Sequence, residues 1–176
     1  MLPQPFAPAL ATERLGLRPF ELEDAAFVLE LVNEPPFLRF IGDKGVRDLE
    51  SARAYLRDGP MASYARHAFG LYLVSLRESG EPLGMCGLID RESLEDVDLG
   101  FAFREAHWGR GYALEAARAV LEDGRKRLGI ERVVAVTDPD NTRSGRLLER
   151  LGLRFEGLIH PGGATLPSRL YVPVED

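Results

Sequence analysis

The chain has 176 residues, a formal net charge of −6, 45% hydrophobic residues and a single cysteine. This length is typical of one domain that buries its core without metal or disulfide support. The acidic charge argues against a nucleic-acid partner, one cysteine excludes an internal disulfide, and no apolar run is long enough to span a membrane. We therefore expect a cytoplasmic protein with no membrane partner.

The first half of the sequence predicts a mostly antiparallel arrangement. Residues 1–11 are rich in proline, and we expect them to form an arm before a domain over 12–176. Apolar spacing predicts a strand, two helices and three strands, in this order: 14–18, 23–33, 48–57, 69–76, 83–89 and 97–103. Pro35-Pro36 should stop the first helix, and Asp58-Gly59-Pro60 should end the second. Short connections make the three later strands antiparallel neighbours.

The second half changes to a strand–helix–strand pattern, which is typical of a right-handed parallel crossover. The predicted elements alternate between helix and strand and end with two strands: 112–128, 132–137, 142–151, 153–159 and 169–174. Pro173 indicates that the last strand lies near an edge or ends there. The fold class is α/β (α+β), a single domain with a mixed, mostly antiparallel sheet of about seven strands and four helices.

The segment from Trp108 to Ala113 joins a strand to the long helix and carries two glycines. Gly109 and Gly111 let the main chain approach a ligand closely, and helix N-termini favour anions. Arg110 adds a positive charge. These features predict a phosphate or pyrophosphate site, although an ordinary glycine turn fits the local sequence equally well.

Two common nucleotide-binding motifs do not fit this turn. A P-loop is excluded because the Gly-Lys-Ser/Thr ending is missing. A dinucleotide-binding turn needs a third glycine where this sequence has Leu114, and it needs a parallel sheet from the start. A nucleotide-dependent enzyme is therefore a weaker hypothesis.

The turn resembles the acyl-CoA signature of the GNAT superfamily, R/Q-x-x-G-x-G/A, with Trp108 in the first position, Gly111 in the fourth and Ala113 in the sixth. Further runs are similar, in the same order, to the RimJ/RimL branch, which acetylates the N-termini of ribosomal proteins and other amines: 12–19, 98–101, 108–116, 138–144 and 148–152. The resemblance covers residues 12–157 and implies a GNAT N-acetyltransferase.

The resemblance implies that strands 97–103 and 132–137 splay apart, so that the pantetheine arm of acetyl-CoA pairs with main-chain groups in the gap. The resemblance implies transfer of the acetyl group to a primary amine, either a peptide N-terminus or a small molecule. We expect direct transfer in a ternary complex, because the sequence offers no suitable cysteine nucleophile. The residues expected to bind the co-substrate are Phe101, Phe103, Trp108, Gly109, Arg110, Gly111, Tyr112, Ala113, Asn141 and Ser144.

Two residues are candidates for the chemistry. The resemblance places Ser144 near the leaving sulfur, where its hydroxyl could donate a hydrogen bond or relay a proton. Helix capping is the alternative, with Asn141 as N-cap and Ser144 in the first turn. Asp98 is the best candidate for a general base, but a solvated residue on the outer sheet face fits equally well. Asp90 and Glu92 are rival bases.

Several features stay open. Phe37, Phe40 and Tyr64 are candidates for the acceptor pocket, although ordinary packing explains each of them alone. The loop 160–167 departs from the ending common in the RimJ/RimL branch, so the acceptor amine is not identified. Gly145 within a short helix costs about 1 kcal/mol relative to alanine, without an evident reason.

The spacing of the three histidines predicts no metal site. A non-catalytic acyl-CoA-binding sensor or interaction module is the alternative function, and the sequence leaves a homodimer open.

Overall fold

The computed structural model describes residues 7–175, and the first six residues of the predicted arm lie outside them. The end of that arm takes part in the sheet. Strand β1 (Leu10–Ala11) pairs antiparallel with β2 (Leu15–Pro19), with Leu10 opposite Leu17. Ala7 is fully buried, so packing begins before the first strand.

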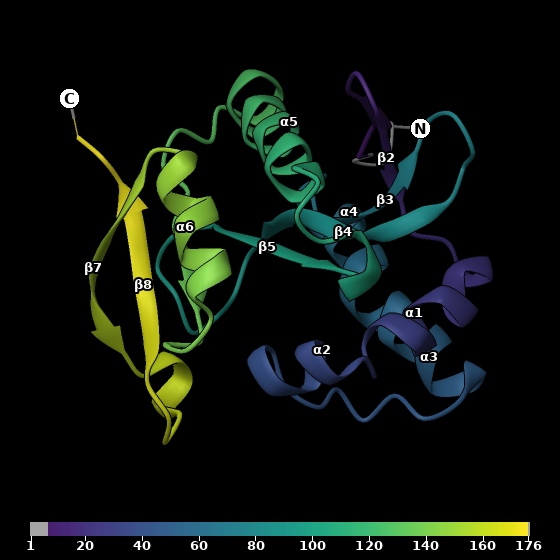
Figure 1. The fold of residues 1–176 in the computed structure, drawn as a ribbon, viewed down its shortest axis with the longest axis horizontal. Coiled ribbons are helices and arrows are strands. Elements are labelled where there is room, and N and C mark those ends of the chain that lie inside the picture. The colour runs from purple at the N-terminus through teal and green to yellow at the C-terminus, as the bar shows by residue number, and fades with distance from the viewer. Residues whose placement is uncertain (1–6, 176) are drawn as a thin grey trace.

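The first half of the chain forms an antiparallel sheet of five strands in the order β1-β2-β3-β4-β5 (Figure 1). The last three strands are β3 (Leu71–Leu76), β4 (Pro82–Ile89) and β5 (Asp98–Phe103). The hairpin connections between them make neighbouring strands antiparallel, as the short loops predict. Cys86 is fully buried in the middle of β4 and belongs to the core, which is the role that its apolar neighbours indicate.

The helices of the first half differ from the prediction in two places. They are, in chain order, α1 (Ala25–Leu31), α2 (Pro35–Phe40), α3 (Leu49–Leu56) and α4 (Ala62–His67), with a short 3₁₀ turn, η1 (Leu22–Asp24), before α1. Pro35 and Pro36 begin a helix, because a first turn needs no donor from its N–H groups. Asp58-Gly59-Pro60 does not end α3. A π-helical turn, η2 (Arg57–Met61), accommodates Pro60 and leads into α4.

The second half forms a separate small sheet. The elements of this half are α5 (Tyr112–Leu128), β6 (Ala135–Thr137), α6 (Thr142–Arg150), β7 (Leu153–Ile159) and β8 (Ser168–Pro173), with 3₁₀ turns η3 (Glu105–His107) and η4 (Pro161–Gly163). The three strands form the small sheet. Strand β8 lies between β6 and β7 and is antiparallel to both. Pro173 therefore marks the end of a central strand, one of the two predicted options.

The two sheets meet at one point. A single parallel bridge joins Asp98 to Val134, where Leu99 N donates to Val134 O at 2.9 Å and Val134 N donates to Val97 O at 3.0 Å. Beyond this bridge β5 and β6 pair with different neighbours. The fold class is confirmed, but the expected sheet of about seven strands is divided into sheets of five and three.

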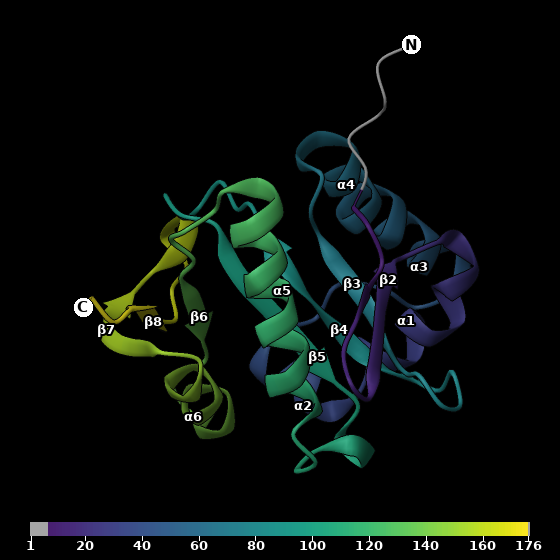
Figure 2. The ribbon, with the colours of Figure 1, turned by 90° about the horizontal axis from the view of Figure 1, so that it is seen from above.

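Two hydrophobic clusters cover opposite faces of the larger sheet. Helix α5 packs on one face through residues such as Ala117 and Val120. Helices α1 and α3 pack on the other through Val28 and Leu56. Figure 2 shows α5 on the near side of β5 and β4, between the two sheets. This helix therefore begins beside the line along which β5 and β6 part.

Candidate active site

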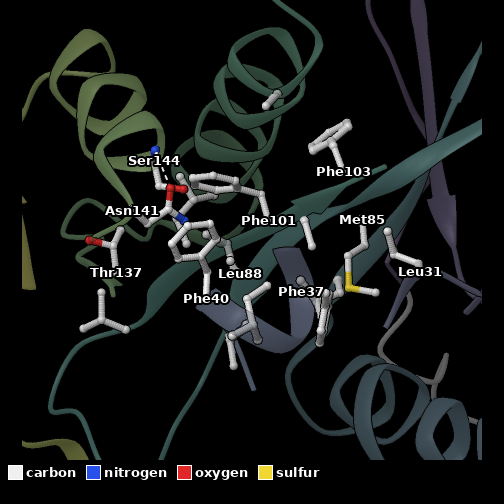
Figure 3. Close-up of a pocket in the computed structure, with 18 of the residues that line it drawn as sticks. Leu31, Phe37, Phe40, Met85, Leu88, Phe101, Phe103, Thr137, Asn141 and Ser144 are labelled. Carbon is white, nitrogen blue, oxygen red and sulfur yellow. Dashed lines mark hydrogen bonds between the residues drawn. The ribbon is translucent and has the colours of Figure 1, made fainter. Parts of the chain in front are cut away.

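A cavity of about 800 Å³ opens where β5 and β6 diverge. Its walls come from α2, β4, β5, β6 and the first turns of α5 and α6. Figure 3 shows Phe40 and Phe101 close to Ser144 and Asn141, with Phe37 and Met85 farther along the same cavity. One continuous space therefore joins the beginning of α6 to the apolar side chains of α2.

The cavity side of β5 offers unpaired main-chain groups. Leu99 N points toward β6, and because strand residues alternate, the main-chain groups of Phe101 face the same side. No strand pairs with Phe101 there among residues 7–175. Phe103 O accepts a hydrogen bond from Trp108 Nε1 at 2.9 Å, so its carbonyl is already occupied. Phe101 is thus the residue best placed to pair with an amide-bearing ligand.

The glycine turn has the geometry of an anion site. Gly109 and Gly111 have φ angles of 78° and 81°, in the left-handed region that favours glycine. Gly111 is the N-cap of α5 and supplies no side-chain cap. Glu115 N is the first amide to bond back to the turn, at 3.1 Å from Gly111 O. The N–H groups of residues 112–114 are therefore available to a negatively charged ligand.

A set of contacts from the segment between β1 and β2, which we call the Arg14 brace, fixes the glycine turn. Arg14 donates to Glu115 Oε1 at 3.0 Å and to Arg110 O at 2.9 Å. Its guanidinium lies 4.5 Å from the centroid of the Tyr112 ring. Thr12 Oγ1 donates to Glu115 Oε2 at 2.7 Å. Arg110 takes part in the brace through its main-chain carbonyl. Its side chain is exposed and does not line the cavity.

Trp108 connects the two halves of the site. Besides its bond to Phe103 O, its ring lies 4.6 Å from the guanidinium of Arg143 in α6. Trp108 therefore has a packing role, and it holds the end of β5 near the start of α6.

The start of α6 combines capping with access to the cavity. Asn141 Oδ1 accepts a hydrogen bond from Ser144 N at 3.2 Å, which makes Asn141 the N-cap. Ser144 lines the cavity, and its hydroxyl has no hydrogen-bond partner among the described residues. Gly145 is buried against β8, and a Cβ at this position would lie only 2.5 Å from Tyr171 Oη. The glycine that sequence analysis left unexplained therefore allows α6 to approach β8.

Asp98 is placed differently from either expectation. Its side chain is 1% exposed, and both carboxylate oxygens accept hydrogen bonds from Arg91 Nε, at 3.0 and 3.1 Å. Burial raises its pKa, with Arg91 opposing the shift. Asp98 does not line the cavity, so it is neither a solvated surface residue nor positioned as a general base. It forms a buried ion pair at the bridge between the two sheets.

The two rival candidates for the general base, Asp90 and Glu92, differ in whether they line the cavity. Asp90 lines the cavity, and His67 Nε2 lies 3.4 Å from its Oδ2. Glu92 is exposed and does not line the cavity. Among the rivals, Asp90 is therefore the one that faces the cavity.

The acceptor side matches two of the three expected aromatic residues. Phe37 and Phe40 line the cavity, together with Met85. Tyr64 does not, because its hydroxyl bonds Phe20 N at 2.9 Å and Leu71 O in the core. Sequence reasoning missed most of the lining residues, among them Leu31, Lys44, Tyr55 and Arg91. Leu31 falls within the predicted helix 23–33, which gives it no functional signal, and the other three carry no local signal either.

Two further observations concern the described residues as a whole. No three His, Cys, Asp or Glu side chains within residues 7–175 gather as metal ligands. In the same part of the chain, every helix is too short or too polar to cross a bilayer.

Residues 14–154 match the family described as the acetyltransferase (GNAT) domain. The uncharacterised N-acetyltransferase p20 of Bacillus licheniformis is 32% identical over 152 residues, which cover 85% of this chain and 84% of that protein.

Two solved structures share the fold. The structure of an acetyltransferase from Agrobacterium tumefaciens superposes with a TM-score of 0.81 and 28% identity, covering 96% of this chain and 95% of the other. RimL, a ribosomal L7/L12 α-N-protein acetyltransferase solved with coenzyme A, has a TM-score of 0.82 with 18% identity and covers 95% and 98% of the two chains. This chain belongs to the GNAT acetyltransferase family and is an acyltransferase.

Proposed function

We propose that the chain transfers the acetyl group of acetyl-CoA to a primary amine by direct attack in a ternary complex. The observation that carries this proposal is the divergence of β5 and β6 after one bridge, with the cavity between them. An opening of this kind offers main-chain groups to an extended, amide-bearing chain. The free N–H groups at the start of α5 lie on the same cavity and suit its diphosphate.

The residues present fit this co-substrate. The main-chain N–H and C=O of Phe101 would pair with pantetheine amides, and the amides of residues 112–114 would bind the pyrophosphate. Thr137 Oγ1 is buried without a hydrogen-bond partner and belongs to a residue that lines the cavity. A buried polar group of this kind is costly unless a ligand or a water molecule satisfies it. A ligand that passes β6 would supply the missing partner.

The chemistry requires a neutral amine, a route for its proton and stabilisation of the leaving thiolate. The amine nitrogen attacks the thioester carbonyl, the carbon–nitrogen bond forms, and the carbon–sulfur bond breaks. We assign to Ser144 a hydrogen bond from its hydroxyl to the leaving sulfur, since it lines the cavity with its hydroxyl unpaired. We assign acceptance of the amine proton to Asp90, which lines the cavity beside His67. The buried position of Asp98 does not support that role.

A direct mechanism also follows from the state of the only thiol. A covalent acetyl-enzyme would need a reactive cysteine, and Cys86 is fully buried. Burial raises the pKa of its thiol, which keeps it protonated and unreactive.

The acceptor belongs to a broad class: a peptide N-terminus or a small-molecule amine. RimL acts on a ribosomal protein, and the runs at 12–19 and 108–116 support placing this chain in the RimJ/RimL branch. The last loop differs from that branch, so we extend its protein specificity no further. A cytoplasmic location remains part of this proposal.

Thiol release from acetyl-CoA against a panel of amines and peptides tests the proposal. Ser144→Ala should lower kcat by about tenfold to a hundredfold while the Kd for CoA stays unchanged, because the hydroxyl acts on the leaving group. Thr142→Ala is the control, since it alters an exposed hydroxyl of the same helix. CoA binding without turnover by the wild type would instead favour an acyl-CoA sensor.

A further inference from the structure

The cavity lining contains more Lys and Arg side chains than carboxylates. Five Lys or Arg side chains belong to the lining, as do four carboxylates: Lys44, Arg66, Arg91, Arg143 and Arg150, and Glu34, Asp58, Asp90 and Asp138. An acidic chain that acetylates amines would be expected to attract cationic acceptors. The local charges of the cavity indicate a different preference.

The lining carboxylates already have partners. Glu34 pairs with Arg104 at 3.4 Å, Asp58 with Arg57 at 3.3 Å, and Asp90 with His67 at 3.4 Å. Asp138 Oδ1 accepts a hydrogen bond from Asp140 N at 2.8 Å. Three of the four therefore have a basic side chain within 3.4 Å, and Asp138 has none among residues 7–175.

Lys44, Tyr55 and Arg91 form what we call the cationic corner. They come from the loop after α2, from α3 and from the loop after β4. Lys44 forms no ion pair with any residue between 7 and 175. All three side chains line the cavity, in which Lys44 is exposed and Tyr55 is half-buried. Partial burial lowers the pKa of Lys44, and the charge of Arg91 lowers it further. Burial raises the pKa of the Tyr55 hydroxyl, and the charge of Arg91 opposes this shift.

Arg91 keeps hydrogen-bonding capacity for a ligand. Only its Nε is used by Asp98, and its two terminal nitrogens have no partner among the described residues. The side chain is 40% exposed. A guanidinium held in this way presents its terminal N–H groups as a fork, the geometry that receives a carboxylate or a phosphate.

The cationic corner lies at the opposite end of β5 from the glycine turn. Arg91 bonds to Asp98, the first residue of β5, whereas the turn follows Phe103, the last. Six strand residues separate these points by roughly 17 Å. The corner is therefore too far away to contribute to the pyrophosphate site, and an anion there would belong to the acceptor.

We infer that the acceptor is an amine that also carries an anionic group, a carboxylate or a phosphate, which the cationic corner binds while apolar parts lie against Phe37 and Phe40. This inference rests on the proposed acetyl transfer. The anionic group would hold the acceptor by one end and leave its amine to reach the thioester beside Ser144.

The test measures KM for matched acceptors with the full chain. The carboxylate series is phenylalanine, phenylalaninamide and phenethylamine, and the phosphate series is phosphoethanolamine and ethanolamine. A diamine represents cationic acceptors. Each variant is compared with the wild type on the same acceptor, so that differences in amine basicity cancel.

We expect the wild type to prefer an anionic member of one series. Lys44→Gln should raise KM for that acceptor by about tenfold, the size of one charge-assisted hydrogen bond, while KM for the neutral analogue and for acetyl-CoA stays unchanged. Lys126→Gln, which changes the other lysine of the sequence, is the matched control.

A second variant tests Arg91. Arg91→Gln is made together with Asp98→Asn, because removing the cation alone would leave a buried unpaired carboxylate. The double variant should show the same selective rise in KM.

Preference for the phosphate or for the carboxylate series, with dependence on Lys44, supports the inference and identifies the anion. Transfer to neutral amines or to the diamine without any anionic preference overturns it and leaves the proposed function standing. An equal effect of Lys44→Gln on neutral and anionic acceptors also overturns it. Absence of transfer to every acceptor refutes the proposed function, and this inference with it.

Discussion

Replacing Arg14 should weaken the binding of acetyl-CoA much more than it weakens the fold. Arg14→Met keeps the length of the side chain and removes the ion pair to Glu115, the bond to Arg110 O and the contact with Tyr112. The side chains of Arg14 and Glu115 are 42% and 22% exposed. Solvent screening therefore limits the ion pair to well under about 1 kcal/mol of global stability.

The local effect is larger because all three contacts act on one turn. A hydrogen bond of about 1 kcal/mol and a cation–π contact of about 0.5 kcal/mol together favour the bound-like conformation of the turn by about 1.5 kcal/mol. Losing that preference lowers the fraction of molecules whose glycine turn is in the binding conformation by about tenfold. The apparent affinity for CoA falls in proportion. We expect KM for acetyl-CoA and Kd for CoA to rise by about tenfold, with kcat at saturation nearly unchanged.

Steady-state kinetics and calorimetric titration with CoA provide the assay. Arg18→Met is the matched control, since Arg18 lies four residues later in β2, pairs with Asp24 at 2.7 Å and is 43% exposed, but makes none of the contacts of the Arg14 brace. Unchanged KM for acetyl-CoA in Arg14→Met would refute the reasoning, as would an equal rise in Arg18→Met.

Two further predictions concern α6 and the bridge between the sheets. Gly145→Ala should destabilise the fold by about 1–3 kcal/mol in denaturant unfolding, because its Cβ would lie 2.5 Å from Tyr171 Oη, and Tyr171→Phe in the same chain should recover part of the loss. Full stability of Gly145→Ala would refute the close approach. Asp98→Asn should leave kcat within about threefold of wild type, because Asp98 does not line the cavity. The raised pKa of Asp98 means that its contribution to stability is present below its ordinary value of 3.8 and is lost as pH rises through the higher folded-state pKa. The free energy of unfolding of Asp98→Asn should therefore not show this decrease as pH rises. A pH profile of unfolding equal to that of the wild type would contradict the raised pKa of Asp98.

The elements with strong local signals could be predicted from the sequence. The bounds 112–128 and 153–159 agree with α5 and β7 because glycines flank α5 and because Gly152 separates α6 from β7. Prolines misled the prediction at α2 and η2, since a proline is tolerated in a first turn and a π-helical turn can accommodate one within a helix. The division into two sheets depends on pairing across the whole chain, which no local pattern contains.

The candidate site also has parts that local sequence could predict and parts that it could not. The glycine turn and the start of α6 could be located because each is a short run with its own backbone requirements. The Arg14 brace joins residues that are 101 positions apart, and the cationic corner joins three separate elements. Asp98 was misplaced because strand alternation indicates a face of the sheet but cannot show that Arg91 covers it.

A structure of the chain with CoA bound tests the central claim most directly. The account predicts that the pantetheine amides pair with the main chain of Phe101 between β5 and β6. It also predicts that the pyrophosphate lies within hydrogen-bonding distance of the amides of residues 112–114. CoA bound elsewhere on the molecule, or β5 and β6 joined along their full length in the complex, would contradict it.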